Sequence, residues 1–434
     1  MDSLTIFLLW VIEMKKKYVI LIVLVVYTLI IFLPPIVHGY VYPNSGDDSA
    51  FHLAYFDGIQ KDGEILSPNY FGQDIVGYPL VWVSDVSGVS IDILFLWFNF
   101  LVLWLVGISV FILVAKFVNW KAGLLAIPMV MFMSPSTLNL YDTGAIFDLM
   151  SVGVILPLGL FCGMQLWVTR KWYWLFPFSL FVVLGVAVHT IILLAVIQSG
   201  KVIEEVTLPI LMGSWGIILG YAVIVMFVIS IVFWVCKYNE LKIDRNAKIL
   251  SYCLFGIVMV LVMLITTEVL GWTLRIALNL AIVLPMLVAC LWGVIINTIR
   301  NNRLVLCFVC LFVIIASLPI MMQYMQYNNA INPLDMKVIA YVNDLDGEYY
   351  SCSPEVAPWV YGRFMDKEYK ESALPHIVRN QPMTSRTTPG TSAYWWEHRT
   401  AGYWRDYEID YVEPNGRITE FKDGELEIYV VADK

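Results

Sequence analysis

The sequence reads Pro43-Asn44-Ser45-Gly46-Asp47-Asp48-Ser49-Ala50-Phe51-His52-Leu53 at the centre of its first long polar segment, residues 39–80. This segment follows the first strongly apolar run and precedes the second. Two adjacent carboxylates and a histidine are therefore expected just beyond a membrane-spanning helix, where lipid head groups meet water. We expect the rest of the chain to be a scaffold that presents this segment.

Composition places the chain among polytopic membrane proteins. It has 434 residues, of which 59% are apolar and 14% charged, and its mean hydropathy is +0.74. Soluble domains carry about 25% charged residues, and the apolar runs approach the roughly 20 residues that a helix needs to cross the hydrocarbon. No basic stripe indicates nucleic-acid binding, and no P-loop or dinucleotide fingerprint indicates nucleotide chemistry.

The apolar runs predict an all-α bundle of about nine membrane spans. The first is Tyr18–Val37, and the others are expected at 92–115, 121–137, 144–168, 172–195, 208–235, 249–270, 275–297 and 304–323. The stretch from Ser134 to Asp148 is predicted to be either an ordinary loop or a re-entrant turn.

Lys and Arg predict the orientation of these spans, because basic residues concentrate in cytoplasmic loops. With the N-terminus inside, the outer short segments hold three basic residues: Lys61, Lys201 and Arg275. The inner segments hold thirteen: Lys15, Lys16, Lys17, Lys116, Lys121, Arg170, Lys171, Lys237, Lys242, Arg245, Lys248, Arg300 and Arg303. Because basic residues are concentrated in the inner segments of this nine-span arrangement, the sequence predicts a cell-membrane protein with a cytoplasmic N-terminus.

Two domains are expected. Residues 1–323 form the transmembrane domain, with its first outer loop at 38–91, and residues 324–434 form a small extracytoplasmic α/β domain. The latter is predicted from two helical stretches, one strand and a terminal alternating pattern: Asp335–Asn343, Val356–Phe364, Glu348–Ser353 and Arg417–Asp433.

The first loop is expected to contain an amphipathic helix over Asp48–Gly58. Phe51, Tyr55 and Ile59 fall on one face at helical spacing, which Leu53 and Phe56 broaden. Such a helix can lie in the membrane interface.

Asp48 and His52 are i, i+4 neighbours on that helix. One interpretation is a general base, or a carboxylate that orients one. The alternative is that Asp47 or Asp48 caps the helix, and the two roles can be divided between the two residues.

A second acidic group follows at the outer turn between the third and fourth spans. Asp142 is interpreted either as a helix cap or as a functional acid. Asp148 lies inside the apolar start of the fourth span, where a carboxylate costs about 2.5–3.5 kcal/mol on insertion scales and indicates a functional site.

Two further polar residues lie at the outer ends of spans. His189 is either a structural hydrogen-bonding group or a ligand-binding one. Arg275 either grips a lipid phosphate in a bidentate manner, or snorkels to the interface or pairs with Glu268.

Taken in order, these features resemble the GT-C superfamily of integral-membrane glycosyltransferases, which use polyprenyl- or dolichyl-phosphate-linked sugars. The resemblance rests on the early acid in the first loop, the Gly-Tyr-Pro-Leu stretch at 77–80, the second acidic turn, the helix-end His189, the outer-end Arg275 and a soluble domain after the last span.

The resemblance implies a mechanism in which Asp47 or Asp48 activates an acceptor hydroxyl on a glycan, lipid or protein. Arg275 and His189 would then stabilise the leaving lipid phosphate. Two departures are clear. The oligosaccharyltransferase branch has Trp-Trp-Asp where this chain has Trp395-Trp396-Glu397, and a D-x-D in the second outer loop is missing. A monosaccharide-type transferase fits better.

No cofactor is certain from the sequence, because its seven cysteines show no metal-binding spacing; a divalent metal, Mg²⁺ or Mn²⁺, stays open from the resemblance alone. Two alternatives to an enzyme were also considered. A lipid-linked sugar transporter or flippase would need charges deep in the bundle and often has inverted repeats. A non-catalytic scaffold would use its outer domain for binding.

Overall fold

A computed structural model describes the helical bundle and short strands near the C-terminus. The residues described are 16–38, 52–53, 56, 59–60, 71–133, 137, 146–185, 220–237, 243–267, 273–298, 303–326, 349–350, 368–369, 377–380, 418–423 and 426–431.

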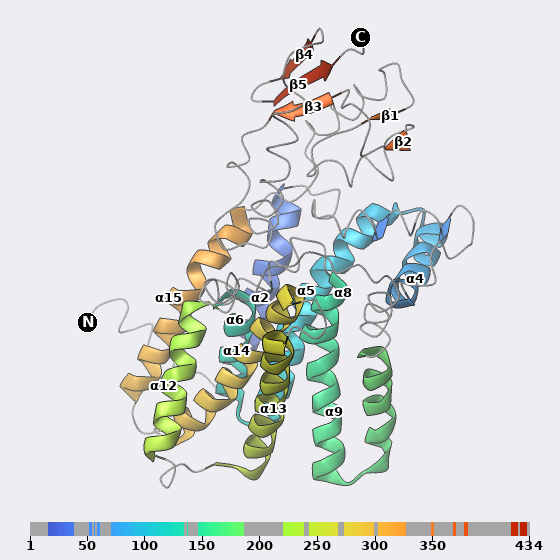
Figure 1. Ribbon diagram of the computed structural model, residues 1–434. Helices are drawn as coiled ribbons and strands as arrows, with labels where there is room; N and C mark the ends of the chain where they lie inside the picture. Colours follow the sequence, from blue (N-terminus) through green and yellow to red (C-terminus); the bar gives the residue numbers. More distant parts are fainter. Residues whose placement is uncertain are drawn as a thin grey trace.

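Helices make up most of this part of the chain (Figure 1). The α-helices are α2 (Lys16–His38), α4 (Phe71–Ser87), α5 (Ile91–Phe117), α6 (Trp120–Pro128), α8 (Ile146–Met150), α9 (Leu156–Thr169), α12 (Tyr221–Lys237), α13 (Arg245–Thr267), α14 (Thr273–Thr298) and α15 (Arg303–Gln326). The π-helix η1 (Met129–Met133) continues α6, and the π-helix η2 (Ser151–Ile155) continues α8. A 3₁₀ turn, η3 (Trp172–Trp174), begins a helix that runs through residue 185.

The predicted all-α membrane bundle is confirmed. Among the described residues, five helices are long and apolar enough to cross a membrane: Lys17–Val37, Ile91–Phe117, Ile146–Thr169, Arg245–Ile265 and Asn279–Thr298. Five shorter apolar helices accompany them: Ile75–Ser87, Trp120–Met133, Trp172–Gly185, Tyr221–Cys236 and Cys307–Met322. The last four overlap the spans predicted at 121–137, 172–195, 208–235 and 304–323, and the total of nine spans stays a prediction.

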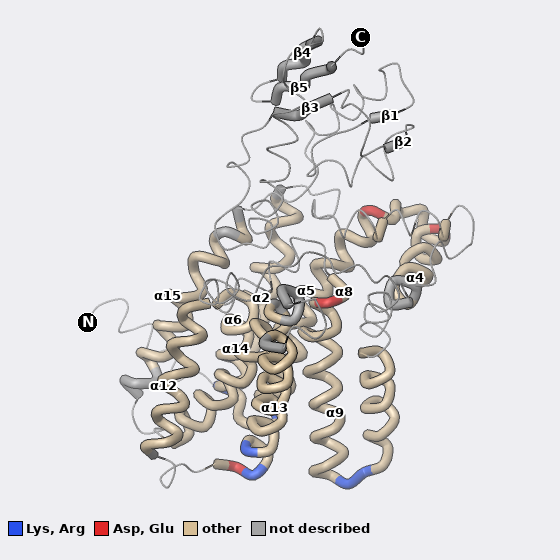
Figure 2. The backbone as a smooth tube through the Cα atoms, viewed as in Figure 1, with Lys and Arg blue, Asp and Glu red and all other residues tan. Residues whose placement is uncertain are grey.

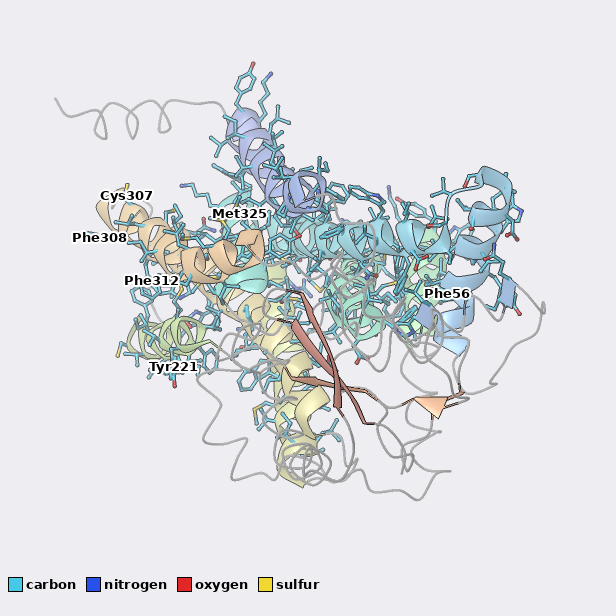
Figure 3. The ribbon with its side chains drawn as sticks, turned by 90° about the horizontal axis from the view of Figure 1, so that it is seen from above. Phe56, Tyr221, Cys307, Phe308, Phe312 and Met325 are labelled. Carbon is cyan, nitrogen blue, oxygen red and sulfur yellow. The ribbon has the colours of Figure 1, made fainter. Side chains whose placement is uncertain are left out.

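The helices differ in how much of their surface the bundle covers. α14 is buried on almost all sides and is the central helix. Helix α15 lies at the edge, where Phe308 and Phe312 are exposed and point away from the neighbouring helices (Figure 3). Exposed apolar side chains of this kind are stable in contact with lipid tails.

Hydrogen bonds between helices fix the packing. The Tyr27 hydroxyl of α2 donates to the Leu103 carbonyl of α5 at 2.6 Å, and the Tyr324 hydroxyl of α15 donates to the Ile31 carbonyl of α2 at 2.9 Å. On the other side of the bundle, Trp292 Nε1 of α14 donates to the Met226 carbonyl of α12 at 3.1 Å. Such bonds contribute to helix association in lipid, where apolar burial alone gives little driving force.

Both π-helices are buried, and each has a carbonyl bonded by a hydroxyl from outside the π-helix. The Ser109 hydroxyl of α5 donates to the Gly153 carbonyl in η2 at 2.7 Å. The Thr137 hydroxyl donates to the Val130 carbonyl in η1 at 2.6 Å. A π-helical turn disturbs the regular hydrogen-bond ladder, and such turns are frequent at functional sites. Most of the stretch between them, including Asp142, lies outside the described residues.

The first loop departs from its prediction at its C-terminal end. Helix α4 occupies 71–87, a stretch that contains Gly77 and Pro79 and that was expected to be loop. In the segment around 52–60, the buried side chains are His52, Leu53, Phe56 and Ile59.

The burial of Leu53, Phe56 and Ile59 agrees with the apolar face predicted for this helix, and His52 is buried beside them. The segment packs into the protein through α4 and α5, so the driving force is burial against these helices and not contact with lipid. Asp48, Phe51 and Tyr55 lie outside the described residues.

Short strands lie beyond one end of the bundle (Figure 1). Strands β3 (Ile377–Asn380), β5 (Leu426–Val431) and β4 (Ile418–Asp423) form an antiparallel sheet in that order, and β1 (Tyr349–Tyr350) pairs in parallel with β2 (Glu368–Tyr369). The strand predicted at 348–353 is thus present in part, and the alternating pattern at 417–433 forms two strands. The helices predicted at 335–343 and 356–364 lie outside the described residues.

Candidate functional site

His52 joins the first loop to the start of α8. Its ring meets the Phe147 ring edge-on, with centroids 4.5 Å apart and the planes at 78°. It also meets the Phe95 ring of α5 edge-on at 5.9 Å. The imidazole is 7% exposed, so a titratable ring is held among apolar rings that exclude water.

The loop side of this contact is held by Phe56, one helical turn after His52. Phe56 stacks on His52 at 6.5 Å and meets Phe95 edge-on at 5.3 Å. Gly77 of α4 makes this arrangement fit, because a Cβ at this position would lie 2.7 Å from the Phe56 ring. Seen from above, the segment carrying Phe56 lies beside α4 and α5 (Figure 3).

Asp148 follows Phe147 directly and is 4% exposed. It lies in the first turn of α8, where free backbone N–H groups and the positive end of the helix favour a carboxylate. The buried imidazole of His52 is one partner of the ring contact with Phe147, and the buried carboxylate of Asp148 belongs to the residue that follows Phe147. Together they supply acid–base groups with little access to water.

Asn99 of α5 faces the same region. It lies one turn below Phe95, whose ring contacts His52. It also lies two turns above Val106, which packs against Gly153 of η2: a Cβ at Gly153 would lie 2.6 Å from Val106 Cγ2. At 100° per residue, all three fall within an arc of about 40° on α5. Asn99 therefore faces α8 and η2, between the levels of Phe147 and Gly153.

The Asn99 side chain is 1% exposed, and neither its amide nitrogen nor its oxygen has a hydrogen-bond partner in the described structure. An unsatisfied buried polar group costs about 1–3 kcal/mol. We name His52, Phe95, Asn99, Phe147 and Asp148 the His52 cluster.

Asp92 lies two turns above Asn99 on α5 and is 9% exposed. It is in the first turn of the helix, which Ser90 caps through a bond from the Ile93 N–H. A first-turn carboxylate is stabilised by the helix end, and this local role explains its position.

Sequence reasoning missed both Asp92 and Asn99. The signal was present, because they are the only polar residues in the otherwise apolar stretch 91–100 and are seven residues apart, which is two helical turns.

Of the predicted site residues, the structure brings together His52 and the Phe147–Asp148 corner. Arg275 lies in the first turn of α14, although its side chain is outside the described part. One turn further on the same helix is Asn279, whose side-chain oxygen is buried without a hydrogen-bond partner. Asp47, Asp48, Asp142 and His189 lie outside the described residues, so their predicted roles stay predictions.

Among the residues that the structure describes, no three His, Cys, Asp or Glu side chains gather in a way that could hold an ion.

No protein-family model and no curated protein matches this chain.

Proposed function

We propose that the protein is a membrane glycosyltransferase that moves a sugar from a polyprenyl-phosphate-linked donor to an acceptor at the outer face of the membrane. The observation that carries the proposal is the buried pairing of His52 with the Phe147–Asp148 corner. This pairing joins the acidic first loop to the second acidic turn, the two segments on which the GT-C resemblance rests.

The distribution of charge supports the orientation. The Lys and Arg coloured blue in Figure 2 gather at the end of the bundle opposite the strands, and the acids coloured red, except one beside the start of α13, lie toward the other end. Under the positive-inside rule, the basic end is cytoplasmic. The first loop and residues 324–434, proposed as an α/β domain, are then extracytoplasmic.

The proposed step is an inverting displacement. Asp47 or Asp48 takes the proton of an acceptor hydroxyl, whose oxygen attacks the anomeric carbon as the bond from that carbon to the phosphate oxygen breaks. The lipid phosphate leaves with the bonding electrons, and Arg275 and His189 stabilise its charge. His52 and Asp148 are both buried and supply groups with little access to water.

The test is sugar transfer by the purified full chain in lipid nanodiscs, with a panel of radiolabelled polyprenyl-phosphate sugars and release of lipid phosphate as readout. We expect Asp47→Asn or Asp48→Asn to abolish turnover, and Asp148→Asn and Arg275→Ala to lower it by at least tenfold. Asp85→Asn is the matched control, because Asp85 is an exposed acid of α4 and the amide oxygen of Asn can still accept the hydrogen bond that Gln60 Nε2 donates to Asp85 at 2.7 Å.

Normal turnover in all four site variants, or no consumption of any donor, would overturn the proposal. Transport of the intact lipid-linked sugar across the bilayer without release of lipid phosphate would instead indicate a flippase.

A further inference from the structure

We propose that Asn99 binds a hydroxyl or amide group on the sugar of the lipid-linked donor. This inference rests on the proposed function and names the part of the substrate that the His52 cluster recognises. Both polar atoms of the Asn99 side chain lack a partner although the residue is 1% exposed.

The chemistry of the missing partner follows from the amide itself. The Asn99 nitrogen donates and its oxygen accepts, and both are unsatisfied. A phosphate offers acceptors only and an ammonium donors only, so each would leave one side of the amide unpaired. A sugar hydroxyl or an acetamido group offers both a donor and an acceptor.

The surroundings of Asn99 suit a sugar. Phe95 lies one turn above it on the same helix, and the rings of Phe95 and Phe147 both contact His52, so apolar ring surfaces lie on the side of α5 that carries the amide. The face of α5 that carries Asn99 looks toward α8 and η2 and not toward lipid. The partner is therefore a polar group of a ligand that enters the protein, and not a lipid tail.

A side chain must move before a sugar can enter, because Asn99 is closed from solvent. We expect this to be His52, since it belongs to the first loop and not to a membrane span. His52 makes ring contacts to Phe56, Phe95 and Phe147, and the face of a sugar ring can pack against the same aromatic rings.

The experiment compares two probes on the full chain in nanodiscs: polyprenyl phosphate, and the same lipid carrying a hexose or an N-acetylhexosamine. Affinity is measured from the ligand-induced rise in the thermal unfolding midpoint. We expect wild type to bind the sugar-bearing lipid more tightly. Asn99→Leu should weaken that binding about tenfold, as expected for loss of well-formed hydrogen bonds, and leave binding of the sugar-free lipid unchanged.

The unliganded protein provides a second readout. An apolar side chain at 99 removes an unsatisfied group, so Asn99→Leu should unfold at the same temperature as wild type or higher. Asn99→Ala serves the same comparison if Leu does not fit. Ser251→Ala is the matched control, because Ser251 is also buried on a helix with an unpartnered side-chain oxygen and should leave both lipids bound as in wild type.

Equal affinity of wild type for both lipids, or unchanged sugar discrimination in Asn99→Leu and Asn99→Ala, would overturn the inference. Turnover that does not depend on Asn99 would leave the transferase standing without this subsite. Sugar binding that depends on Asn99 without any turnover would overturn the transferase and leave the sugar site standing.

Discussion

The rings of His52 and Phe147 meet edge-on with their centroids 4.5 Å apart, and this contact ties a segment of the first loop to the beginning of a membrane helix 95 residues later in the chain. The contact places Asp148, the next residue, beside a loop histidine. The contact attaches this segment of the loop to the bundle. Helices α4 and α5 contribute further contacts, through Gly77 and Phe95, to Phe56 of the same segment.

Gly77→Ala should disturb the site through Phe56. The new methyl group would lie 2.7 Å from the Phe56 ring, so Phe56 must shift, and His52 is stacked on it. We expect sugar transfer to fall by at least fivefold and the unfolding midpoint to drop. Size-exclusion chromatography after heating measures the second effect.

Gly256→Ala is the matched control, because no atom lies within 4 Å of a Cβ at that position in α13. Alanine is the better helix former, so its midpoint should equal or exceed that of wild type. If both glycine variants behaved alike, Gly77 would have no role in holding Phe56.

Long apolar runs made the helices predictable, because a span must satisfy its own backbone groups in lipid and is therefore helical whatever its neighbours. The same runs hid the buried faces. In a soluble helix, apolar residues mark the side that faces the core. In this chain, apolar residues such as Phe98 and Phe100 are stable both against lipid and against other helices, so they do not mark one side. Asn99 between them was counted as part of an apolar run.

The site could be predicted only in part for a related reason. Asp148 was recognisable as a carboxylate in the apolar start of a helix. That His52 contacts the preceding residue, Phe147, is set by tertiary packing. The sequence predicted only that His52 is an i, i+4 neighbour of Asp48. Its burial follows from Leu53, Phe56 and Ile59, which pack inward against α4 and α5. The π-helices also have no signature in hydrophobic spacing.

Tyr27→Phe should weaken the contact between α2 and α5. It removes the 2.6 Å hydrogen bond to the Leu103 carbonyl while the ring keeps its packing against Gly107. We expect a loss of about 1 kcal/mol, the usual size for a hydrogen bond between membrane helices, seen as a lower midpoint of heat denaturation. Tyr221→Phe, at an exposed position of α12, should leave the midpoint unchanged, and an equal effect of the two changes would contradict the role of this bond.

Ser109→Ala should destabilise the junction between α5 and η2. The Ser109 hydroxyl donates to the Gly153 carbonyl at 2.7 Å, and its removal leaves that carbonyl of the π-helix short of a donor in a buried place. The expected cost is about 1–3 kcal/mol, again measured by heat denaturation. Ser87→Ala removes a hydroxyl that bonds the Val83 carbonyl on the exposed side of α4 and should change stability by less than about 0.5 kcal/mol. A Ser109 variant as stable as the Ser87 variant would show that η2 does not need this bond.

The proposed orientation predicts which positions a membrane-impermeant maleimide reaches in intact cells. With all seven cysteines replaced by alanine, single cysteines are introduced at Val86, 69% exposed near the end of α4, and at Trp172, 81% exposed in η3. Val86→Cys should label without permeabilisation, because α4 belongs to the first outer loop. Trp172→Cys should label only after permeabilisation, since it follows Arg170 and Lys171 at the basic end of the bundle. An even number of spans between the two positions would give labelling from the same side, so the reverse of either result would break the nine-span alternation. A Val86→Cys that labelled only after permeabilisation would also move the acidic first loop, and with it the proposed chemistry, to the cytoplasmic face.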